Sequence, residues 1–243
     1  MKIAFRLQPF VALAAGLSAL AGCGATVQPI DVMEGCPDMP LRGPAEFAAA
    51  APPENMIDDF EDGEVPALPM IGGRNGAWIT TPQVPPPGQM VSAETSTRCV
   101  ASGTQSAHLT SSGVPPYGAS WTATMLAPFG SATPYNAGAY SGFSFWIARG
   151  ESAMPPFETP IGVNTTDTAM NGMCMPCGDY YAIRKRIPLT RTWTRWYVPF
   201  SDLAQYGFGN PLVPLARERL VSLIIWPEPQ QVDIWIDDIR FEP

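Results

Sequence analysis

From Asn55 onward the chain is a succession of short apolar or alternating runs, separated by Gly, Pro and Asn. Runs of period two that are bounded by turn-forming residues are typical of the strands of a sandwich or barrel. The 28 prolines and 22 glycines fit a turn-rich β protein better than a helical bundle. The sequence therefore predicts one all-β domain, a β-sandwich of about ten strands, over residues 55–243.

The predicted strands are short and lie close together along the chain. The clearest of them cover residues 56–61, 77–81, 106–111, 120–126, 142–149, 193–200, 220–226 and 232–241. The run Leu220–Trp226 is apolar on both faces, which predicts a central strand of a sheet. Two segments, 201–205 and 215–219, show helical hints, and each is long enough only for a single turn.

The first 22 residues have the features of an export signal. Lys2 and Arg6 precede an apolar run of 13 residues, Phe10–Gly22, which is too short to span a bilayer. The run leads into Leu20-Ala21-Gly22-Cys23, which resembles the lipobox of bacterial lipoproteins. The resemblance implies that Cys23 becomes an acylated N-terminus after cleavage and attaches the protein to a membrane through lipid.

The residue after this cysteine bears on the destination of the protein. In the resembling proteobacterial lipoproteins an Asp at this position often signals retention in the inner membrane, whereas this chain has Gly24. The resemblance therefore favours the outer membrane over the inner membrane. An ordinary signal peptide that is cut nearby, with an incidental cysteine, is the alternative.

The charge of the chain argues against two classes of partner. The formal net charge is −8, and removal of Lys2 and Arg6 with the signal leaves 12 basic against 22 acidic residues, or −10. Nucleic acids and anionic lipid surfaces repel such a protein. We expect neither as a partner, and we expect the mature protein to be a monomer.

Residues 23–54 are rich in Ala, Pro and Gly and predict a flexible tether. The tether contains Cys36, which with Cys99, Cys174 and Cys177 makes four cysteines besides Cys23. Export to an oxidising compartment favours disulfides, and four cysteines allow three pairings. The short loop between Cys174 and Cys177 favours a local bridge, which leaves Cys36 to pair with Cys99.

Two other uses of these cysteines are less favoured. A redox-active Cys-x-x-Cys pair normally opens a helix after a strand, and Gly178–Tyr181 does not look like a helix start. A zinc site needs four ligands, and the single histidine of the chain, His108, lies far from Cys174 and Cys177 in the sequence.

Several segments carry a family resemblance through their order along the chain. They are Ile57–Gly63, Gly73–Trp78, Tyr140–Trp146, Trp193–Phe200 and Asp233–Ile239. This arrangement resembles the galactose-binding-like jelly rolls, and most closely the carbohydrate-binding modules of family 11. The resemblance implies a jelly-roll β-sandwich over about residues 55–243 and a carbohydrate as the ligand.

The acidic residues at the two ends of the domain predict a structural cation. In an extended segment Asp59 and Glu61 point to one side of the strand while Phe60 points to the other. Carboxylate oxygens suit calcium, and in the resembling family the first and last strands run side by side. The resemblance implies Ca²⁺ ligands at Glu61 and Asp237, with Asp59 as a third. The alternative is that these acids cap turns or face solvent.

Sugar recognition by a sandwich needs exposed aromatic rings and polar groups that bond hydroxyls. Most tryptophans, including Trp146, Trp193, Trp226 and Trp235, lie in strongly apolar runs and are predicted to pack in the core. For Trp78 a binding role and a structural role are equally favoured. The predicted ligand-binding residues are therefore taken from turn-rich segments. They are Tyr117, Trp121, Asp179, Tyr180, Tyr181 and Arg74.

The sequence favours a binding module over an enzyme. It contains no Gly-x-Ser-x-Gly and no His-Glu-x-x-His, and His108 alone provides no base for a catalytic triad. The first hypothesis is an envelope lipoprotein that binds a polysaccharide or glycan without cutting it. The second is a structural or protein-interaction module of the envelope, and a glycoside hydrolase with an unrecognised carboxylate pair is a minor alternative.

Overall fold

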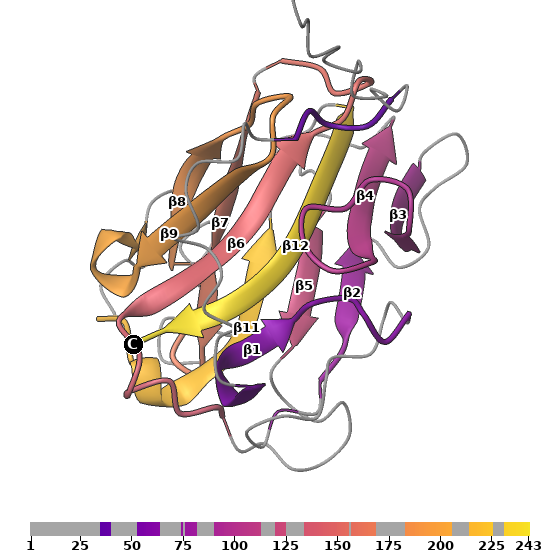
Figure 1. Cartoon of the computed structure of the whole chain (residues 1–243). Helices are drawn as coiled ribbons and strands as arrows, with labels where there is room; N and C mark the ends of the chain where they lie inside the picture. The colour runs from indigo at the N-terminus through magenta and orange to yellow at the C-terminus, as the bar shows by residue number, and fades with distance from the viewer. Residues whose placement is uncertain are drawn as a thin grey trace, which may run out of the picture. The chain divides into compact units, whose positions relative to one another are not determined.

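The computed structural model describes residues 35–39, 53–63, 74, 76–81, 90–112, 120–124, 134–155, 157–168, 183–205, 214–225 and 231–243. Within these ranges the chain is all-β and forms two six-stranded sheets, one layered on the other (Figure 1). The predicted fold class is therefore confirmed. The helical elements in this part of the chain are 3-10 turns, at Pro53–Asn55, Phe200–Asp202 and Arg217–Arg219, and none is long and apolar enough to cross a membrane.

The first sheet carries both ends of the domain. Its strands, in spatial order, are β3 (Met90–Ser96), β4 (Ser106–Ser112), β12 (Val232–Glu242), β6 (Gly142–Arg149) and β9 (Thr194–Pro199). The short strand β1 (Met56–Asp58) also pairs with β12 in antiparallel register. The first and last strands thus lie side by side, as the resemblance implies.

The second sheet is built from the middle of the chain. Its strands, in spatial order, are β10 (Ala204–Gln205), β8 (Ile183–Pro188), β7 (Glu158–Thr165), β11 (Leu220–Ile225), β5 (Ser120–Thr124) and β2 (Trp78–Thr81). Strand β11 lies between β7 and β5. This confirms the central position predicted from its two apolar faces.

The main core lies between the sheets, and strand β6 shows how the sequence builds it. Phe143, Phe145 and Ile147 are buried in the core cluster, while Ser144 and Trp146 occupy the alternate positions on the outer face. Each large apolar side chain that is fully buried contributes roughly 1.5–3 kcal/mol. In Figure 1, β6 and β12 run side by side in the middle of the first sheet. The alternating side chains of these two strands therefore form much of the core-facing side and much of the outer side of this sheet.

The predicted first strand, residues 56–61, is shorter in the structure. Strand β1 ends at Asp58 because Phe60 adopts a positive φ of 60° and the chain turns at residues 60–63. The side chain of Asp58 fixes this turn by accepting hydrogen bonds from the Phe60 backbone N–H, at 2.8 Å, and from the Trp78 indole, at 2.7 Å. Trp78 is buried there, which gives it a structural role.

A second apolar cluster lies on the outer face of the first sheet. It contains Cys36, Cys99, Ala148, Trp193 and Trp235, so the two tryptophans are buried outside the main core. We call residues 35–39 the strap, because a disulfide joins Cys36 to Cys99 over this cluster. The predicted pairing of Cys36 with Cys99 is confirmed, whereas Cys174, Cys177 and Trp226 lie outside the described residues.

Backbone hydrogen bonds also fix the strap to the sheet. The Asp38 N–H donates to the Arg191 carbonyl at 2.8 Å, and the Trp193 N–H donates to the Asp38 carbonyl at 2.9 Å. The Arg191 guanidinium donates to the Cys36 carbonyl at 3.0 Å. The predicted tether, residues 23–54, therefore contains a point at which the chain is firmly attached to the domain.

Candidate functional site

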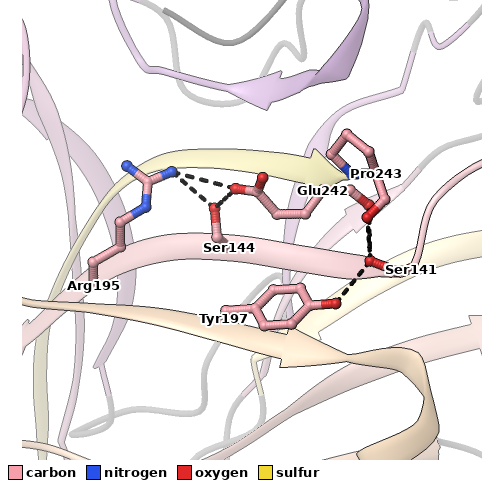
Figure 2. Close-up of a pocket in the computed structure, with 6 residues that line it drawn as sticks. All are labelled: Ser141, Ser144, Arg195, Tyr197, Glu242 and Pro243. Atoms are coloured by element: carbon pink, nitrogen blue, oxygen red, sulfur yellow. Dashed lines mark hydrogen bonds and ion pairs between the residues drawn. The ribbon is translucent and has the colours of Figure 1, made fainter. Parts of the chain in front are cut away.

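An open pocket of about 510 Å³ lies on the outer face of the first sheet. It is lined by Ser141, Ser144, Arg195, Tyr197, Glu242 and Pro243 (Figure 2). Ser141 and Ser144 come from the start of β6 and the residue before it, Arg195 and Tyr197 from β9, and Glu242 and Pro243 from the end of β12 and the residue after it. These three strands are distant in sequence and become neighbours only when the sheet forms.

Strand alternation brings the polar side chains of the pocket to one face. In β9, Trp196 packs against the main core and Val198 is buried in it, so Arg195 and Tyr197 point outward. Tyr197 is opposite Ser144 in the register of β9 and β6. The Tyr197 side chain is unusually open for a large aromatic residue, with 46% of its surface exposed, and its hydroxyl shares a hydrogen bond of 2.7 Å with Ser141.

Arg195 lies at the base of the pocket and is held by several partners. Its guanidinium is 3.1 Å from the Asp238 carboxylate, 2.8 Å from the Ser144 hydroxyl and 3.5 Å from the Glu242 carboxylate. Figure 2 shows Arg195, Ser144 and Glu242 converging above β6. The Arg195 side chain is only 11% exposed, so these partners compensate a largely desolvated charge.

The charges around the pocket are balanced. Glu242 pairs with both Arg195 and Arg240, and its carboxylate also accepts a hydrogen bond from Ser144. Asp238 supplies a second acid against the two arginines. The pocket therefore presents an aromatic ring, hydroxyl groups and a carboxylate that is already paired, without a strong net charge.

Four of the predicted ligand-binding residues, Tyr117, Asp179, Tyr180 and Tyr181, lie outside the described residues. Trp121 belongs to β5, where its backbone pairs with Ile225 of β11 and Thr80 of β2. The strand that carries Trp121 is thus part of the second sheet, whereas the described pocket lies on the first.

The sixth predicted ligand-binding residue, Arg74, is enclosed within the fold and is 1% exposed. Its guanidinium donates to the Tyr135 hydroxyl at 2.8 Å and to the backbone carbonyls of Glu54 and Met56. It also lies over the rings of Tyr135 and Phe241. This placement favours a structural role for Arg74 over contact with a ligand.

The three acids predicted to bind calcium are each engaged with the backbone. Both Glu61 oxygens accept hydrogen bonds from Thr104, and one also accepts from the Gln105 N–H. These bonds outweigh the effect of burial and hold the pKa of Glu61 below its ordinary value. Asp59 accepts from the Glu61 N–H at 3.2 Å.

Asp237 also contacts the loop that contains Thr104 and Gln105, at the residues just before them. The Asp237 side chain is fully buried. Its Oδ2 accepts hydrogen bonds from the backbone N–H groups of Ala101, at 3.0 Å, and Ser102, at 2.8 Å. Burial raises the pKa of Asp237 to about 7, although these hydrogen bonds oppose the shift. Among the described residues its Oδ1 has no hydrogen-bond partner.

Glu61 and Asp237 thus hold neighbouring parts of the loop formed by residues 101–105. In the described ranges, no three His, Cys, Asp or Glu side chains are grouped so that they could hold a metal ion. Asp59, Glu61 and Asp237 therefore do not form the three-acid cluster that the sequence predicts. Calcium binding stays a prediction, and the Asp237 Oδ1 is a buried oxygen without a hydrogen-bond partner among the described residues.

His108 in β4 is held by contacts with two residues of β12. Its Nε2 lies 2.8 Å from the Asp233 carboxylate, and its ring stacks on Trp235 with the centroids 3.8 Å apart. Ser152 donates two further hydrogen bonds to Asp233, which with His108 lower the pKa of Asp233 in spite of its burial. The His108 side chain thus joins β4 to β12.

The fold of the chain is similar to that of two solved modules. One is the family 11 carbohydrate-binding module from Clostridium thermocellum in complex with a β-1,3-1,4-mixed-linked tetrasaccharide, with 15% identity, a TM-score of 0.51, and coverage of 77% of this chain and 94% of that one. The other is the family 11 module of the cellulosomal cellulase Lic26A-Cel5E from the same organism, with 15% identity, a TM-score of 0.50, and coverage of 79% and 96%.

No family model and no curated protein matches the sequence. At 15% identity the two solved modules establish the fold alone. They confirm the jelly-roll resemblance that the order of motifs predicts.

Proposed function

We propose that this chain is an envelope lipoprotein, anchored by lipid at Cys23, whose sandwich domain binds a polysaccharide or glycan and does not cleave it. The observation that carries the proposal is the pocket on the first sheet, where the half-exposed ring of Tyr197 lies among hydroxyl and charged groups. The likeness to a family 11 module that was solved with a bound tetrasaccharide supports the same ligand class.

The chemistry of the pocket suits a sugar. The C–H face of a pyranose ring packs on an aromatic ring, while its hydroxyls exchange hydrogen bonds with polar side chains. Tyr197 supplies the ring, and Ser141 and Glu242 supply groups that accept or donate hydrogen bonds nearby. A single aromatic residue in an open pocket supports modest affinity, which is suited to many weak contacts along a polymer.

The acids of this pocket support binding rather than hydrolysis. A glycosidase needs one carboxyl group that holds a proton and a second that is free to act as base or nucleophile. Here Asp238 pairs with Arg195, and Glu242 pairs with Arg195 and Arg240. Burial raises the pKa of Asp238 although Arg195 and Arg240 oppose the shift. Both carboxylates are nevertheless engaged by arginines, so neither is free to act as a base or nucleophile. Incubation with the glycan that binds should therefore release no reducing ends.

Replacing Tyr197 with Ala should weaken glycan binding by about tenfold, or ~1.4 kcal/mol, because the stacking surface is lost. Tyr197→Phe is the matched control, since it keeps the ring and loses only the hydroxyl that bonds Ser141. Affinity electrophoresis and calorimetry against mixed-linked glucan, cellulose, xylan and peptidoglycan would measure the effect.

The same assay separates the competing hypotheses. Binding that is unchanged in Tyr197→Ala and lost in Tyr117→Ala or Trp121→Ala would move the sugar site to those predicted residues. A folded protein that binds none of the glycans would instead favour an envelope protein-interaction module.

Lipid attachment has its own test in whole cells. The parent protein should be found in the membrane fraction and should incorporate a clickable palmitate analogue, whereas Cys23→Ser should be soluble and unlabelled, because no thiol remains to be acylated. Density-gradient separation of the two membranes then tests the outer-membrane proposal. Equal labelling of parent and Cys23→Ser would exclude Cys23 as the lipid site.

A further inference from the structure

Strand β12 changes the direction of its side chains partway along. Before the change, Val232, Ile234 and Ile236 are buried in the main core, and after it Ile239 and Phe241 are buried there. Inward positions therefore switch from even to odd residue numbers. The pairing of β12 with β6 shifts register between Asp237 and Arg240, which marks a β-bulge at the switch.

The bulge places two consecutive acids on the outer side of the sheet. Asp238 has a positive φ of 48°, a conformation that Asp adopts more readily than most residues. Asp237 bonds the backbone of Ala101 and Ser102, while the Asp238 carboxylate lies 3.1 Å from the Arg195 guanidinium. Without the bulge, consecutive residues would point to opposite faces, and Asp238 would face the apolar core.

Asp238 and Glu242 support Arg195 in different ways. Glu242 is shared, because it lies 3.5 Å from Arg195 and 3.1 Å from Arg240. In the described ranges, the close ion pair of Asp238 is with Arg195, while the charge of Arg240 acts on Asp238 without a close contact. The Asp238 and Arg195 side chains are both 11% exposed, so water competes little with their contact.

We infer that Asp238 is a positioning residue of the pocket: it acts through Arg195, whose guanidinium it holds at the base of the site where a ligand binds. The inference rests on the proposed sugar-binding function for its effect on affinity. It assigns a function to the β12 bulge, which is to redirect one carboxylate from the core toward the pocket.

Asp238→Asn tests the inference because Asn tolerates the same positive φ and keeps the bulge, but removes the charge. It should weaken glycan binding by about fivefold, as Arg195 loses its fixed orientation. Arg195→Met should weaken binding by about tenfold, and adding Asp238→Asn to it should cause no further loss. Asp237→Asn is the matched control, since it alters the same bulge without touching Arg195, and its affinity should equal that of the parent.

A second readout does not need a ligand. NMR relaxation of the Arg195 Nε should report a rigid side chain in the parent and in Asp237→Asn, and a mobile one in Asp238→Asn. A rigid Arg195 in Asp238→Asn would overturn the inference, as would equal losses of affinity from Asp238→Asn in the presence and absence of Arg195. If the parent binds no glycan, the proposed function fails and the relaxation measurement alone decides whether Asp238 positions Arg195.

Discussion

Replacing Cys36 and Cys99 together with serine should lower the free energy of unfolding by about 4 kcal/mol. The bond joins residues 63 positions apart, so it removes much of the conformational freedom of the unfolded chain. Its loss should also release the strap and uncover Trp193 and Trp235, which are 2% and 6% exposed in the intact domain. Urea unfolding of a soluble Cys23→Ser parent and of the variant, with tryptophan emission recorded in both, would measure the two effects.

Cys174→Ser with Cys177→Ser is the matched control. A bridge across so short a loop constrains the unfolded chain less, and its loss should cost about 2 kcal/mol, or nothing where the two thiols are free. Free thiols counted under denaturing conditions establish which case holds. A Cys36→Ser, Cys99→Ser variant as stable as its parent, with unshifted tryptophan emission, would show that the strap contributes little to the fold.

A rise in pH from about 4 to about 8 should destabilise the domain by several kcal/mol. Burial raises the pKa of Asp58 and of Asp237 from 3.8 to about 7. Between these values the folded protein retains two protons that the unfolded chain has released, so stability falls as the pH rises through about 7. The loss is on the order of 4 kcal/mol for each carboxyl group, at about 1.4 kcal/mol per unit of pKa.

The opposite dependence holds at lower pH. Hydrogen bonds lower the pKa values of Glu61 and Asp233, so their contribution is lost as the pH falls through the acidic range. The two trends together place maximum stability between about pH 4 and pH 5. Urea unfolding in the presence of a chelator, repeated with Asp237→Asn to remove one of the two groups, measures the profile. Stability that is constant or rising from about pH 5 to pH 8 would contradict the prediction.

Adding calcium to the same stability measurements tests whether Asp237 binds an ion. An ion at Asp237 favours the charged carboxylate, so added Ca²⁺ should raise the melting temperature of the parent most strongly near pH 8. The same addition should have little effect on Asp237→Asn. A parent that responds to Ca²⁺ no more than this variant would remove Asp237 from the calcium proposal.

The sequence predicts best those strands whose alternation is strong and whose surroundings are apolar. The range of β6 agrees with residues 142–149 at both ends, and β11 lies at the centre of its sheet as predicted. The missed strands have weaker signals. Strand β3 has a largely polar sequence at a sheet edge, β7 contains Pro160 and Gly162, and β8 carries three basic residues in a row. Their strand structure depends on pairing with neighbouring strands, which the local sequence does not reveal.

The pocket was harder to predict than the fold. The alternation of polar and apolar residues in β9 identifies Arg195 and Tyr197 as outward residues. In β12, the apolar residues shift from even to odd positions, and this shift in the sequence is a signal for the bulge. Neither signal shows that β9, β6 and β12 are neighbours, which is what brings Tyr197, Ser144 and Glu242 together. The tryptophans illustrate the same limit, because apolar runs predict burial but not that Trp193 and Trp235 are buried beneath the strap.

The strap also limits the reach of the domain under the proposed lipid attachment at Cys23. If Cys23 carries the lipid, an unattached tether would let strand β1 move up to about 115 Å from the membrane surface, since an extended chain spans at most about 3.5 Å per residue. Because the chain is attached to the domain at Cys36, the segment between Cys23 and the strap can span at most about 45 Å. The pocket would then reach only glycans in the layer of the envelope nearest the membrane. The effective concentration of the pocket in that layer would be much higher than with the longer tether.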